Sequence, residues 1–551
     1  MKFFSNLVLT FCLLPFALSA AELVSFNAAG TDSANMESTD ASEDSTQLIA
    51  GNRYLVFRSD ASDFGPVDTN GDTDIYLRDL QTDTIELISV NSADTDSGNG
   101  GSFGAAISDD GRYVVFNSSA SDLVATDTNG TTDLFIRDRD TDTTRLISKN
   151  VAATDSANDS SSTFDMTPDG QWVVYSSYAS DLVATDTNAN SDIFLYSTMA
   201  DSVSLVSINL AGTDSGNGGS ELERPHVITN DGRYIVFGST ASDLITTDAN
   251  GFRDVFLRDL MSGTTTRISE DSMNVGFTGN SGTAVISADG SRIAFGSFGA
   301  NVTALPDANG TGDYFAYEVS SGDIEMITVN AAGTAAGTGG SDASDVRISD
   351  DGRYFAFESG KTDLVNLTDT NGVRDAFLRD LETGVTTLLS RRADGTATAN
   401  DLSKNIQINH DASVVVYQAG ASDIVTDTDN NGMGTDDVFV YLRQTGMNYL
   451  VSANASDSGS GNGRSWDPIL SVDGSLVYFN SEASDLDASI ADTNTASDVY
   501  LVRVADVLPA PADDDDSSGG GGGSINPLWL LMLILSTMLP GRNKNPIPAK
   551  T

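Results

Sequence analysis

The sequence predicts an all-β fold, an eight-bladed β-propeller of four-stranded antiparallel blades closed by the N-terminal strand. Three observations point to this fold. One unit recurs eight times at intervals of 58 to 62 residues, and so regular a period indicates a repeat architecture. Each unit contains four short apolar runs. The last unit is one run short, and a matching run stands near the N-terminus.

The unit is easiest to follow from the turn between its first two runs. In the second copy the four runs cover residues 105–107, 113–116, 133–137 and 144–148. They are rich in Val, Ile, Phe and Tyr and are bounded by Gly, Asp, Asn and Ser, which is the pattern of β-strands. Four-stranded units arranged radially form a propeller, whose closure covers the sheet edges. The second residue of the first turn marks the copies at Gly51, Gly111, Gly170, Gly232, Gly290, Gly352, Ala412 and Gly474.

The two ends of the repeat region complement each other. After the strand predicted at residues 498–504, the chain continues through residues 505–511 without a fourth strand. Residues 22–33 match the fourth strand and following loop at residues 204–215. We therefore expect residues 22–28 to complete the eighth blade.

The turn before the second strand resembles the TolB-type, WD-like propeller repeat, in which a Ser-Pro-Asp-Gly-like turn precedes an aromatic-rich strand. The resemblance extends over residues 22–505 and implies the propeller fold. It implies no single function, because propellers include enzymes, binding proteins and scaffolds. The residues that carry it are Ser108-Asp109-Asp110-Gly111-Arg112-Tyr113, Thr167-Pro168-Asp169-Gly170-Gln171-Trp172 and Ser349-Asp350-Asp351-Gly352-Arg353-Tyr354.

The composition is strongly acidic. The chain has 29 Lys and Arg against 79 Asp and Glu, a formal net charge of −50. Nucleic acid and anionic membrane surfaces are therefore unfavourable partners, whereas cations are attracted. Hydrophobic residues make up 39% of the chain and are concentrated in the strands, so a folded core is expected.

Residues 1–21 read as a secretory signal peptide. Lys2 precedes an apolar stretch at residues 3–18, and the small residues Ala20 and Ala21 mark a signal peptidase site before Ala21 or Glu22. The only cysteine, Cys12, lies within this leader. The mature propeller is therefore expected to have no disulfide.

The C-terminal region follows a second pattern, with an acidic and Gly-rich linker at residues 506–524, an apolar segment at 525–541 and a basic tail at 542–551. It resembles the GlyGly-CTERM sorting signal of Gram-negative bacteria. That resemblance implies cleavage by a rhombosortase-like protease and delivery to the cell surface or medium. The alternative is a membrane anchor that faces the periplasm, although fifteen apolar residues span only about 22 Å of a core about 30 Å thick. The expected processing residues are Gly519, Gly520, Gly521, Gly522 and Gly523.

The loop between strands two and three repeats Asp-x-Asn-Gly-x-x-Asp or a close variant. Oxygen ligands at alternate positions around a glycine turn suit Ca²⁺, which takes six to eight oxygens. The candidate ligands in the loop are Asp68, Asn70 and Asp74; Asp127, Asn129 and Asp133; Asp186, Asn188 and Asp192; Asp248, Asn250 and Asp254; Asp307, Asn309 and Asp313; Asp369, Asn371 and Asp375; Asp427, Asp429, Asn431, Asp436 and Asp437; and Asp492, Asn494 and Asp498. In seven copies a further acid precedes the loop, at Asp63, Asp122, Asp181, Asp243, Asp363, Asp423 and Asp485. The fifth copy has Asn301 at this position.

An ion-free interpretation of these loops is also open. Asp, Asn and Gly form turns without a metal, because Asp and Asn bond the backbone and Gly accepts positive φ. The acid upstream of the loop and the acid that begins strand three could instead accept hydrogen bonds from loop amides.

Evidence for catalysis is sparse. The sequence has neither a Gly-x-Ser-x-Gly elbow nor an HExxH motif, and its histidines, His226 and His410, fall in different blades. We expect an exported, monomeric, non-catalytic binding or scaffold protein for a protein or glycan ligand. One alternative is an extracellular polysaccharide hydrolase or lyase, and another is a periplasmic TolB-like component of an envelope complex. Carboxylates with an Arg or His in one channel mouth would favour the enzyme, and a repeated, smooth mouth the binder.

Overall fold

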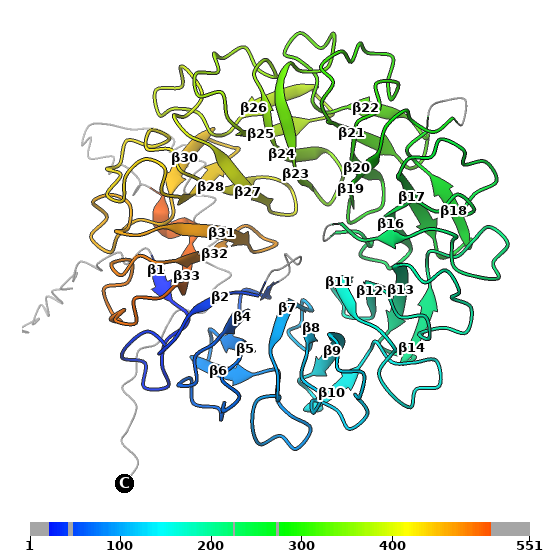
Figure 1. Cartoon of the computed structure of the whole chain (residues 1–551). Helices are drawn as coiled ribbons and strands as arrows, with labels where there is room; N and C mark the ends of the chain where they lie inside the picture. Colours follow the sequence, from blue (N-terminus) through cyan, green and yellow to red (C-terminus); the bar gives the residue numbers. More distant parts are fainter. Residues whose placement is uncertain (1–20, 42–47, 224–225, 271–274, 509–551) are drawn as a thin grey trace, which may run out of the picture.

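The computed structural model describes residues 21–41, 48–223, 226–270 and 275–508. The expected cleavage site lies at the boundary of this region, and the rest of the expected signal peptide and the expected processing residues 519–523 lie outside it. The described chain forms eight antiparallel sheets around a central opening (Figure 1). This confirms the predicted eight-bladed β-propeller. In the described residues no helix is long and apolar enough to span a membrane.

The first four blades follow the chain from the inner strand to the outer strand. Blade 1 contains β2 (Ser38–Asp40), β4 (Tyr54–Ser59), β5 (Asp74–Asp79) and β6 (Thr84–Leu87), with β3 (Ile49–Ala50) paired to β4. Blade 2 contains β7 (Ser102–Ile107), β8 (Tyr113–Ser118), β9 (Asp133–Asp138) and β10 (Thr143–Leu146). Blade 3 contains β11 (Ser161–Met166), β12 (Trp172–Ser177), β13 (Asp192–Ser197) and β14 (Ser202–Leu205). Blade 4 contains β15 (Ser220–Glu221), β16 (Tyr234–Ser239), β17 (Asp254–Asp259) and β18 (Thr264–Arg267).

The other four blades repeat this order. Blade 5 contains β19 (Ser281–Ile286), β20 (Arg292–Ser297), β21 (Asp313–Glu318) and β22 (Ile324–Met326). Blade 6 contains β23 (Gly339–Ile348), β24 (Tyr354–Lys361), β25 (Asp375–Asp380) and β26 (Val385–Leu388). Blade 7 contains β27 (Ser403–Ile408), β28 (Val414–Ala419), β29 (Asp437–Leu442) and β30 (Met447–Leu450). Blade 8 contains β31 (Ser465–Leu470), β32 (Leu476–Ser481), β33 (Asp498–Arg503) and β1 (Ala21–Leu23), and the 3₁₀ turn η1 (Val504–Val507) follows β33.

The N-terminal strand closes the ring, as the sequence predicts. β1 pairs antiparallel with β33, with Ala21 opposite Val502 and Leu23 opposite Tyr500, and Figure 1 shows the two ends of the described chain side by side. The paired segment is shorter than the predicted residues 22–28. The chain turns away after Val24, whose N–H donates to the Val499 carbonyl at 2.8 Å.

The core is built from stacked aromatic pairs and from contacts between blades. Every blade places an aromatic ring of strand two against one of strand three, with centroids 5.6–6.1 Å apart. Such cross-strand pairs stabilise antiparallel sheets. In blades 1 to 4 the aromatic after the turn contacts the corresponding turn of the next blade. A Cβ on Gly111, which has φ +73°, would lie 2.2 Å from the Tyr54 ring. These aromatics therefore pack between blades.

Deleting residues 21–28 should open the ring. The deletion removes Leu23 and Val24, which are fully buried, and exposes the edge of β33. We expect the thermal midpoint of the mature protein to fall by about 10 °C or more, measured by circular dichroism. A synthetic peptide of residues 21–28 added to the truncated protein should raise the midpoint again, because it binds only the native state. An unchanged midpoint after deletion would contradict closure by this strand.

Candidate functional site

The aspartate that begins strand three is buried and hydrogen-bonded within the chain. In blade 2, Asp133 accepts hydrogen bonds from Ser148 Oγ and Asn129 Nδ2, both at 2.7 Å. Asn129 Nδ2 also donates to the Ala157 carbonyl at 2.8 Å, and Ser148 Oγ accepts from Leu134 N at 3.0 Å. Through Ser148 and Asn129, the Asp133 carboxyl group thus connects strand three to the end of strand four and to the loop that leads to the next blade.

A serine or threonine two residues after strand four donates to this aspartate in all eight blades, at 2.5–2.9 Å. These hydroxyl groups are absent from the sequence-predicted site, although a hydroxyl residue at one position of every copy is a visible signal. The donors are Ser25, Ser89, Ser148, Ser207, Ser269, Thr328, Ser390 and Ser452.

The acid that precedes the loop between strands two and three binds a different loop, the one that connects the preceding blade to strand one. Asp122 Oδ1 accepts from Asn99 N at 2.9 Å, and Asn301 accepts from Thr278 N at 3.0 Å in the fifth blade. Because a neutral amide oxygen fills the same role as the carboxylates, this contact needs no cation. The other carboxylates that accept a loop N–H in this way are Asp63, Asp181, Asp243, Asp363, Asp423 and Asp485.

The first aspartate of the loop motif bonds to neighbouring side chains that vary between blades. Asp68 accepts from Tyr76 Oη at 2.6 Å and from Ser97 Oγ at 3.1 Å. Asp186 and Asp492 accept from the equivalent serines, whereas Asp248 accepts from Arg267 at 3.1 Å. Among the described residues, no group of three or more acidic, His or Cys side chains is arranged to hold a metal ion. The observed contacts fit the ion-free interpretation, and calcium stays a prediction.

Burial raises the pKa of the strand-three aspartates. The pKa of Asp133 rises to about 7 because burial disfavours its charged form, although the Ser148 hydrogen bond opposes the shift. In blades 4 and 5 a buried cation lies close to this position, Arg267 at 3.5 Å from Asp254 and Lys361 at 3.1 Å from Asp313. Similar shifts occur at Asp74, Asp192, Asp375 and Asp437, to about 7, and at Asp498, to about 8.

The inner strands depart from the repeat. Register shifts interrupt most of them, and non-glycine residues take left-handed φ at Thr283 (52°), Asn405 (54°) and Asp467 (50°). Bulges re-aim side chains and are frequent next to functional sites. The fifth position of strand two also differs between blades, while the positions around it repeat. Its occupants are Arg58, Asn117, Ser176, Gly238, Gly296, Glu358, Gln418 and Asn480.

These irregular positions meet in a polar network across blades 7, 8 and 1. We name Asp40, Asn405, Gln418, Asp467 and Asn480 the channel network. Asn405 Nδ2 donates to Asp467 and, at 2.9 Å, to Gln418 Oε1, which also accepts from Asp467 N at 2.7 Å. Asn480 makes two hydrogen bonds with Asp40: its Oδ1 accepts from the Asp40 backbone N–H, and its Nδ2 donates to the Asp40 carboxylate. Burial and the neighbouring Asp40 raise the pKa of Asp467 to about 6.

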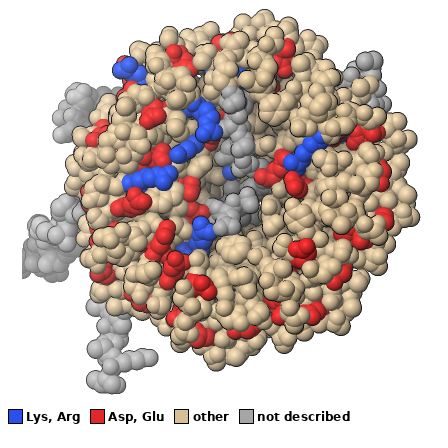
Figure 2. All heavy atoms as spheres, viewed as in Figure 1, with Lys and Arg blue, Asp and Glu red and all other residues tan. Residues whose placement is uncertain are grey.

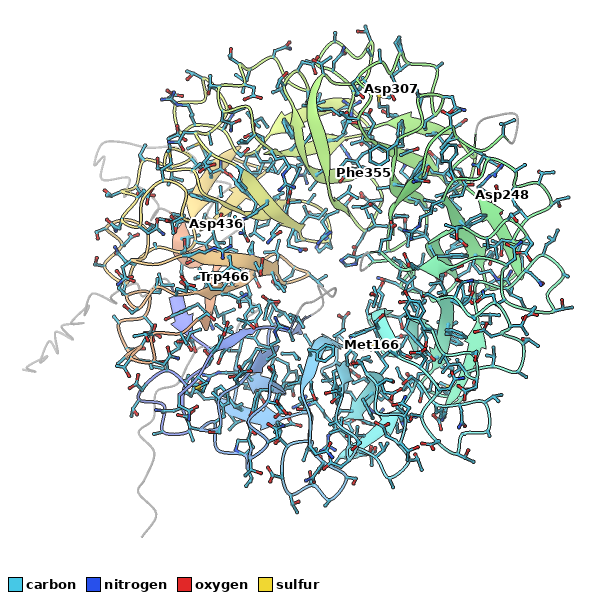
Figure 3. All side chains as sticks on the ribbon, in the orientation of Figure 1. Met166, Asp248, Asp307, Phe355, Asp436 and Trp466 are labelled. Atoms are coloured by element: carbon cyan, nitrogen blue, oxygen red, sulfur yellow. The ribbon has the colours of Figure 1, made fainter. Side chains whose placement is uncertain are left out.

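A charged rim borders the channel network. Arg464 contacts Asp436 through Nε and Nη2, both at 2.9 Å, and Lys404 Nζ lies 3.3 Å from the same carboxylate. The Arg464 guanidinium lies 4.8 Å from the Trp466 ring centroid. Figure 2 shows Lys and Arg gathered beside the central opening, and Figure 3 labels Asp436 and Trp466 on this side of the ring. Of the sequence-predicted residues, Asp436 is therefore a rim residue that belongs to this site.

The two histidines contribute little to this site. His226 is exposed in the inner segment of blade 4, where its backbone has φ 66°. His410 is exposed in the turn between β27 and β28. Asp165 of β11 holds the His226 segment by accepting from Val227 N at 2.8 Å.

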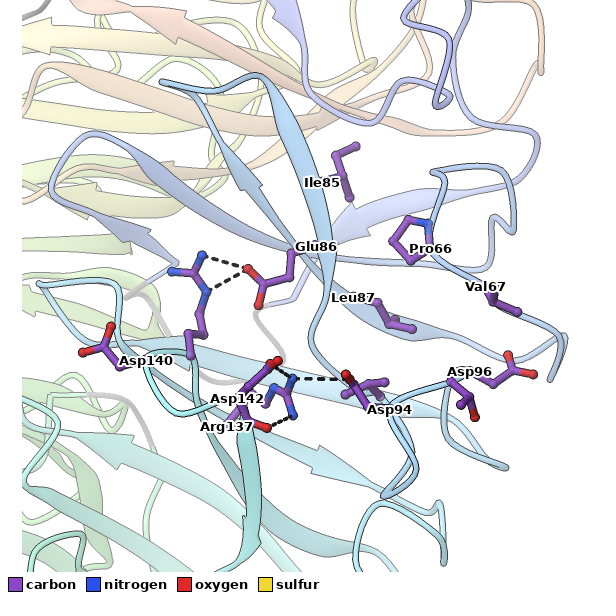
Figure 4. A pocket seen from close by; sticks show the side chains of 13 residues that line it. Pro66, Val67, Ile85, Glu86, Leu87, Asp94, Asp96, Arg137, Asp140 and Asp142 are labelled. Atoms are coloured by element: carbon purple, nitrogen blue, oxygen red, sulfur yellow. Dashed lines mark hydrogen bonds and ion pairs between the residues drawn. The ribbon is translucent and has the colours of Figure 1, made fainter.

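A groove of about 720 Å³ lies on the outer side of blades 1 and 2 (Figure 4). Its cations are paired with carboxylates. Arg139 donates to Glu86 through Nε and Nη2 at 3.0 and 2.8 Å, and Arg137 contacts Asp142 and lies 3.7 Å from Asp94. None of the sequence-predicted ligands lines it. The channel network and its rim are therefore the stronger candidate for function.

No protein-family model matches the chain, and no curated protein matches it. Solved structures similar to it include an oligogalacturonate lyase from Vibrio parahaemolyticus, at 11% identity over 85% of this chain and 91% of that chain, with a TM-score of 0.43. A prolyl endopeptidase matches at 13% identity over 85% of this chain and 56% of that chain, with a TM-score of 0.43. TolB from Acinetobacter baumannii matches at 15% identity over 74% of this chain and 81% of that chain, with a TM-score of 0.30. The activities named for these proteins differ, and they assign none to this chain.

Stability should fall as the pH rises from about 4 to 8. An aspartate whose pKa is 3.8 in the unfolded chain and about 7 in the folded chain binds protons more readily when folded. The stability that it contributes is complete below the unfolded value and is lost through pH 7. Hydrogen bonds from Arg233 lower the pKa of Asp259 to about 2, so its contribution is constant in this range. We expect a thermal midpoint several degrees higher at pH 5 than at pH 8, at constant ionic strength.

Removing titrating groups provides the control for this pH dependence. Replacing Asp133 and Asp192 with Asn should reduce the difference between the midpoints at the two pH values. A midpoint in the parent protein that is equal at both pH values, or higher at pH 8, would show that these carboxyl groups are ionised in the folded state.

Calcium binding predicts a different response. If the loops bind Ca²⁺, millimolar calcium should raise the thermal midpoint by several degrees and a chelator should reverse the change, because the ion binds the native state. Asp127→Asn and Asp133→Asn together should reduce the calcium response. An identical midpoint with calcium and with chelator would remove the calcium prediction and leave the hydrogen bonds as the full account of these loops.

Proposed function

We propose that this protein is an exported, non-catalytic binding protein that holds a glycan at one side of its channel mouth. The observation that carries the proposal is the channel network with its rim. Amide groups, carboxylates, two cations and the Trp466 ring occur there together in blades 7, 8 and 1. Gln418 and Asn480 are buried, whereas Lys404, Arg464 and Trp466 are partly exposed. Sugar hydroxyls both donate and accept hydrogen bonds, and the C–H faces of a sugar ring pack on aromatic rings. A site with hydrogen-bond donors, hydrogen-bond acceptors and an aromatic ring can therefore bind both the hydroxyl groups and the C–H face of a sugar.

Trp466→Ala should weaken glycan binding about tenfold or more, a loss typical of an aromatic anchor. Suitable probes are laminarin, xylan, dextran and alginate, titrated into the mature protein by calorimetry. Phe103→Ala is the matched control, since Phe103 occupies the same repeat position in blade 2, and it should leave the affinity unchanged. The proposal fails if no probe binds, or if both variants bind as the parent protein does.

The second candidate function is hydrolysis or elimination on an extracellular polysaccharide. Three features favour it: Arg464 beside the Asp436 carboxylate at the channel mouth, the departure of the channel wall from the repeat, and the raised pKa of Asp467 beside Asp40. A carboxyl group that stays protonated near pH 6 next to a second carboxyl group is an arrangement used for general acid catalysis on glycosides. In that case, the parent protein should release new reducing ends from one of the four probes. Asp467→Asn should abolish that release while it leaves the affinity within about threefold.

The proposed location is the cell surface or the medium, with cleavage at both ends. β1 begins at Ala21, so cleavage before Ala21 preserves the whole closing strand. Mass analysis of the surface protein should give an N-terminus at Ala21 or Glu22 and a C-terminus within residues 519–523. A mature protein that retains residues 525–541 would instead support the membrane anchor.

A further inference from the structure

A second charged cluster lies in blades 4 and 5. Arg253 Nη1 lies 2.5 Å from Glu223 Oε1 and 3.4 Å from Glu221 Oε2. Glu223 also accepts a hydrogen bond from the backbone N–H of Thr283 in β19. The ion pair lies within blade 4, and the hydrogen bond from Thr283 to Glu223 connects it to blade 5. The side chains of Arg253 and Glu223 are each 23% exposed, so water or a ligand reaches both.

Two glycines make room for this ion pair. A Cβ on Gly238 would lie 2.6 Å from Arg253 Nη2, and one on Gly282 would lie 2.6 Å from Glu223 Oε2. Neither glycine has a left-handed φ, so space and not backbone conformation requires them. All other blades except blade 5, which has Gly296, carry larger residues at the Gly238 position, such as Asn117 and Gln418. The cluster is therefore a feature built into these blades and not a by-product of the repeat.

Exposed aromatic side chains flank the cluster. Phe252 is 40% exposed and Phe298 is 69% exposed. Asn280 connects them to the ion pair, since its Oδ1 accepts from Arg253 N and its carbonyl accepts from Phe298 N, both at 3.0 Å. Single exposed apolar residues are ordinary. Two of them beside a partly exposed ion pair form a surface with the same chemistry as Arg464, Asp436 and Trp466.

The two clusters lie on the same face of the propeller. Arg253 precedes β17 and Arg464 precedes β31, and the register of the blades puts the beginnings of strands one and three at one end of each sheet. Blades 4 and 8 are opposite in a ring of eight. Figure 2 shows basic side chains on both sides of the opening. Most other blades carry an uncharged residue at the Arg253 position, such as Thr73, Thr132 and Gly312.

We propose that Phe252, Arg253, Glu223 and Phe298 form a second sugar-binding subsite. The ligand is then a linear oligosaccharide chain that reaches across the channel opening from blade 8 to blades 4 and 5. This inference rests on the proposed glycan-binding function and specifies the length and orientation of the ligand. An oligosaccharide that occupies two weak subsites at once binds much more tightly than one that occupies either subsite alone. This gain requires that the oligosaccharide is long enough to reach both subsites.

Oligomers of two to twelve sugar residues from laminarin, xylan, dextran and alginate test the proposal by calorimetry on the mature protein. Affinity should rise steeply once the chain is long enough to contact both clusters. Phe298→Ala should lower the affinity for the longest oligomers about tenfold, equivalent to about 1.4 kcal/mol, and leave the affinity for the shortest within twofold. Tyr178→Ala is the matched control. Tyr178 holds the same repeat position in blade 3 and is 52% exposed, and its replacement should change neither affinity.

The outcomes separate the two proposals. If Trp466→Ala weakens binding of long oligomers while Phe298→Ala leaves it unchanged, glycan binding stands and the second subsite is wrong. If the parent protein binds none of the oligomers, the proposed function itself is wrong. Phe298 is largely exposed, so its variant should keep the parent thermal midpoint, and Gly238→Val should reproduce the loss of long-chain affinity by displacing Arg253.

Discussion

The propeller depends on one hydrogen-bonded carboxyl group that recurs at the beginning of strand three in every blade. In blade 2, Asp133 binds Ser148, which follows strand four, and Asn129 of the preceding loop, and Asn129 in turn holds the loop that leads to blade 3. A buried carboxyl group without partners would be strongly destabilising, whereas a satisfied one specifies a single arrangement of its neighbours. The same group therefore determines the shape within a blade and its connection to the next.

Burial of so many carboxyl groups is compatible with a strongly acidic chain because most of them need not be ionised. Desolvation raises the pKa of Asp74 and Asp375 to about 7, so much of the charge is removed by protonation near neutral pH. Blades 4 and 5 use a second solution, in which Arg267 or Lys361 supplies a positive charge nearby. Both solutions avoid an isolated buried charge, the most unfavourable state for such a group.

Departures from the repeat concentrate around the channel. The inner serine and the following turn are nine residues apart in five blades, as from Ser102 to Gly111. The separation is 13 residues in blade 1 (Ser38 to Gly51) and 12 in blade 4 (Ser220 to Gly232). In blade 6 the residue at this position, paired with Ser359, is Asp342, ten residues before Gly352. Inner-strand bulges and the variable fifth position of strand two lie in the same layer. A stable fold needs none of these differences, and sites where local rules fail are often functional. The symmetric outer layers thus support an asymmetric channel wall.

The number of blades, the four strands of each and the closure by the N-terminal segment could be predicted from the sequence, because all three are local patterns with a regular period. The acidic loop could be predicted as well, but not the partners of its oxygens, which are hydroxyl groups just after strand four. Which polar residues meet in the channel depends on the tertiary structure. Asp40 and Asn480 are 440 residues apart in the chain and bond each other, because ring closure brings blade 8 against blade 1. No local period encodes a contact that depends on completing the whole ring.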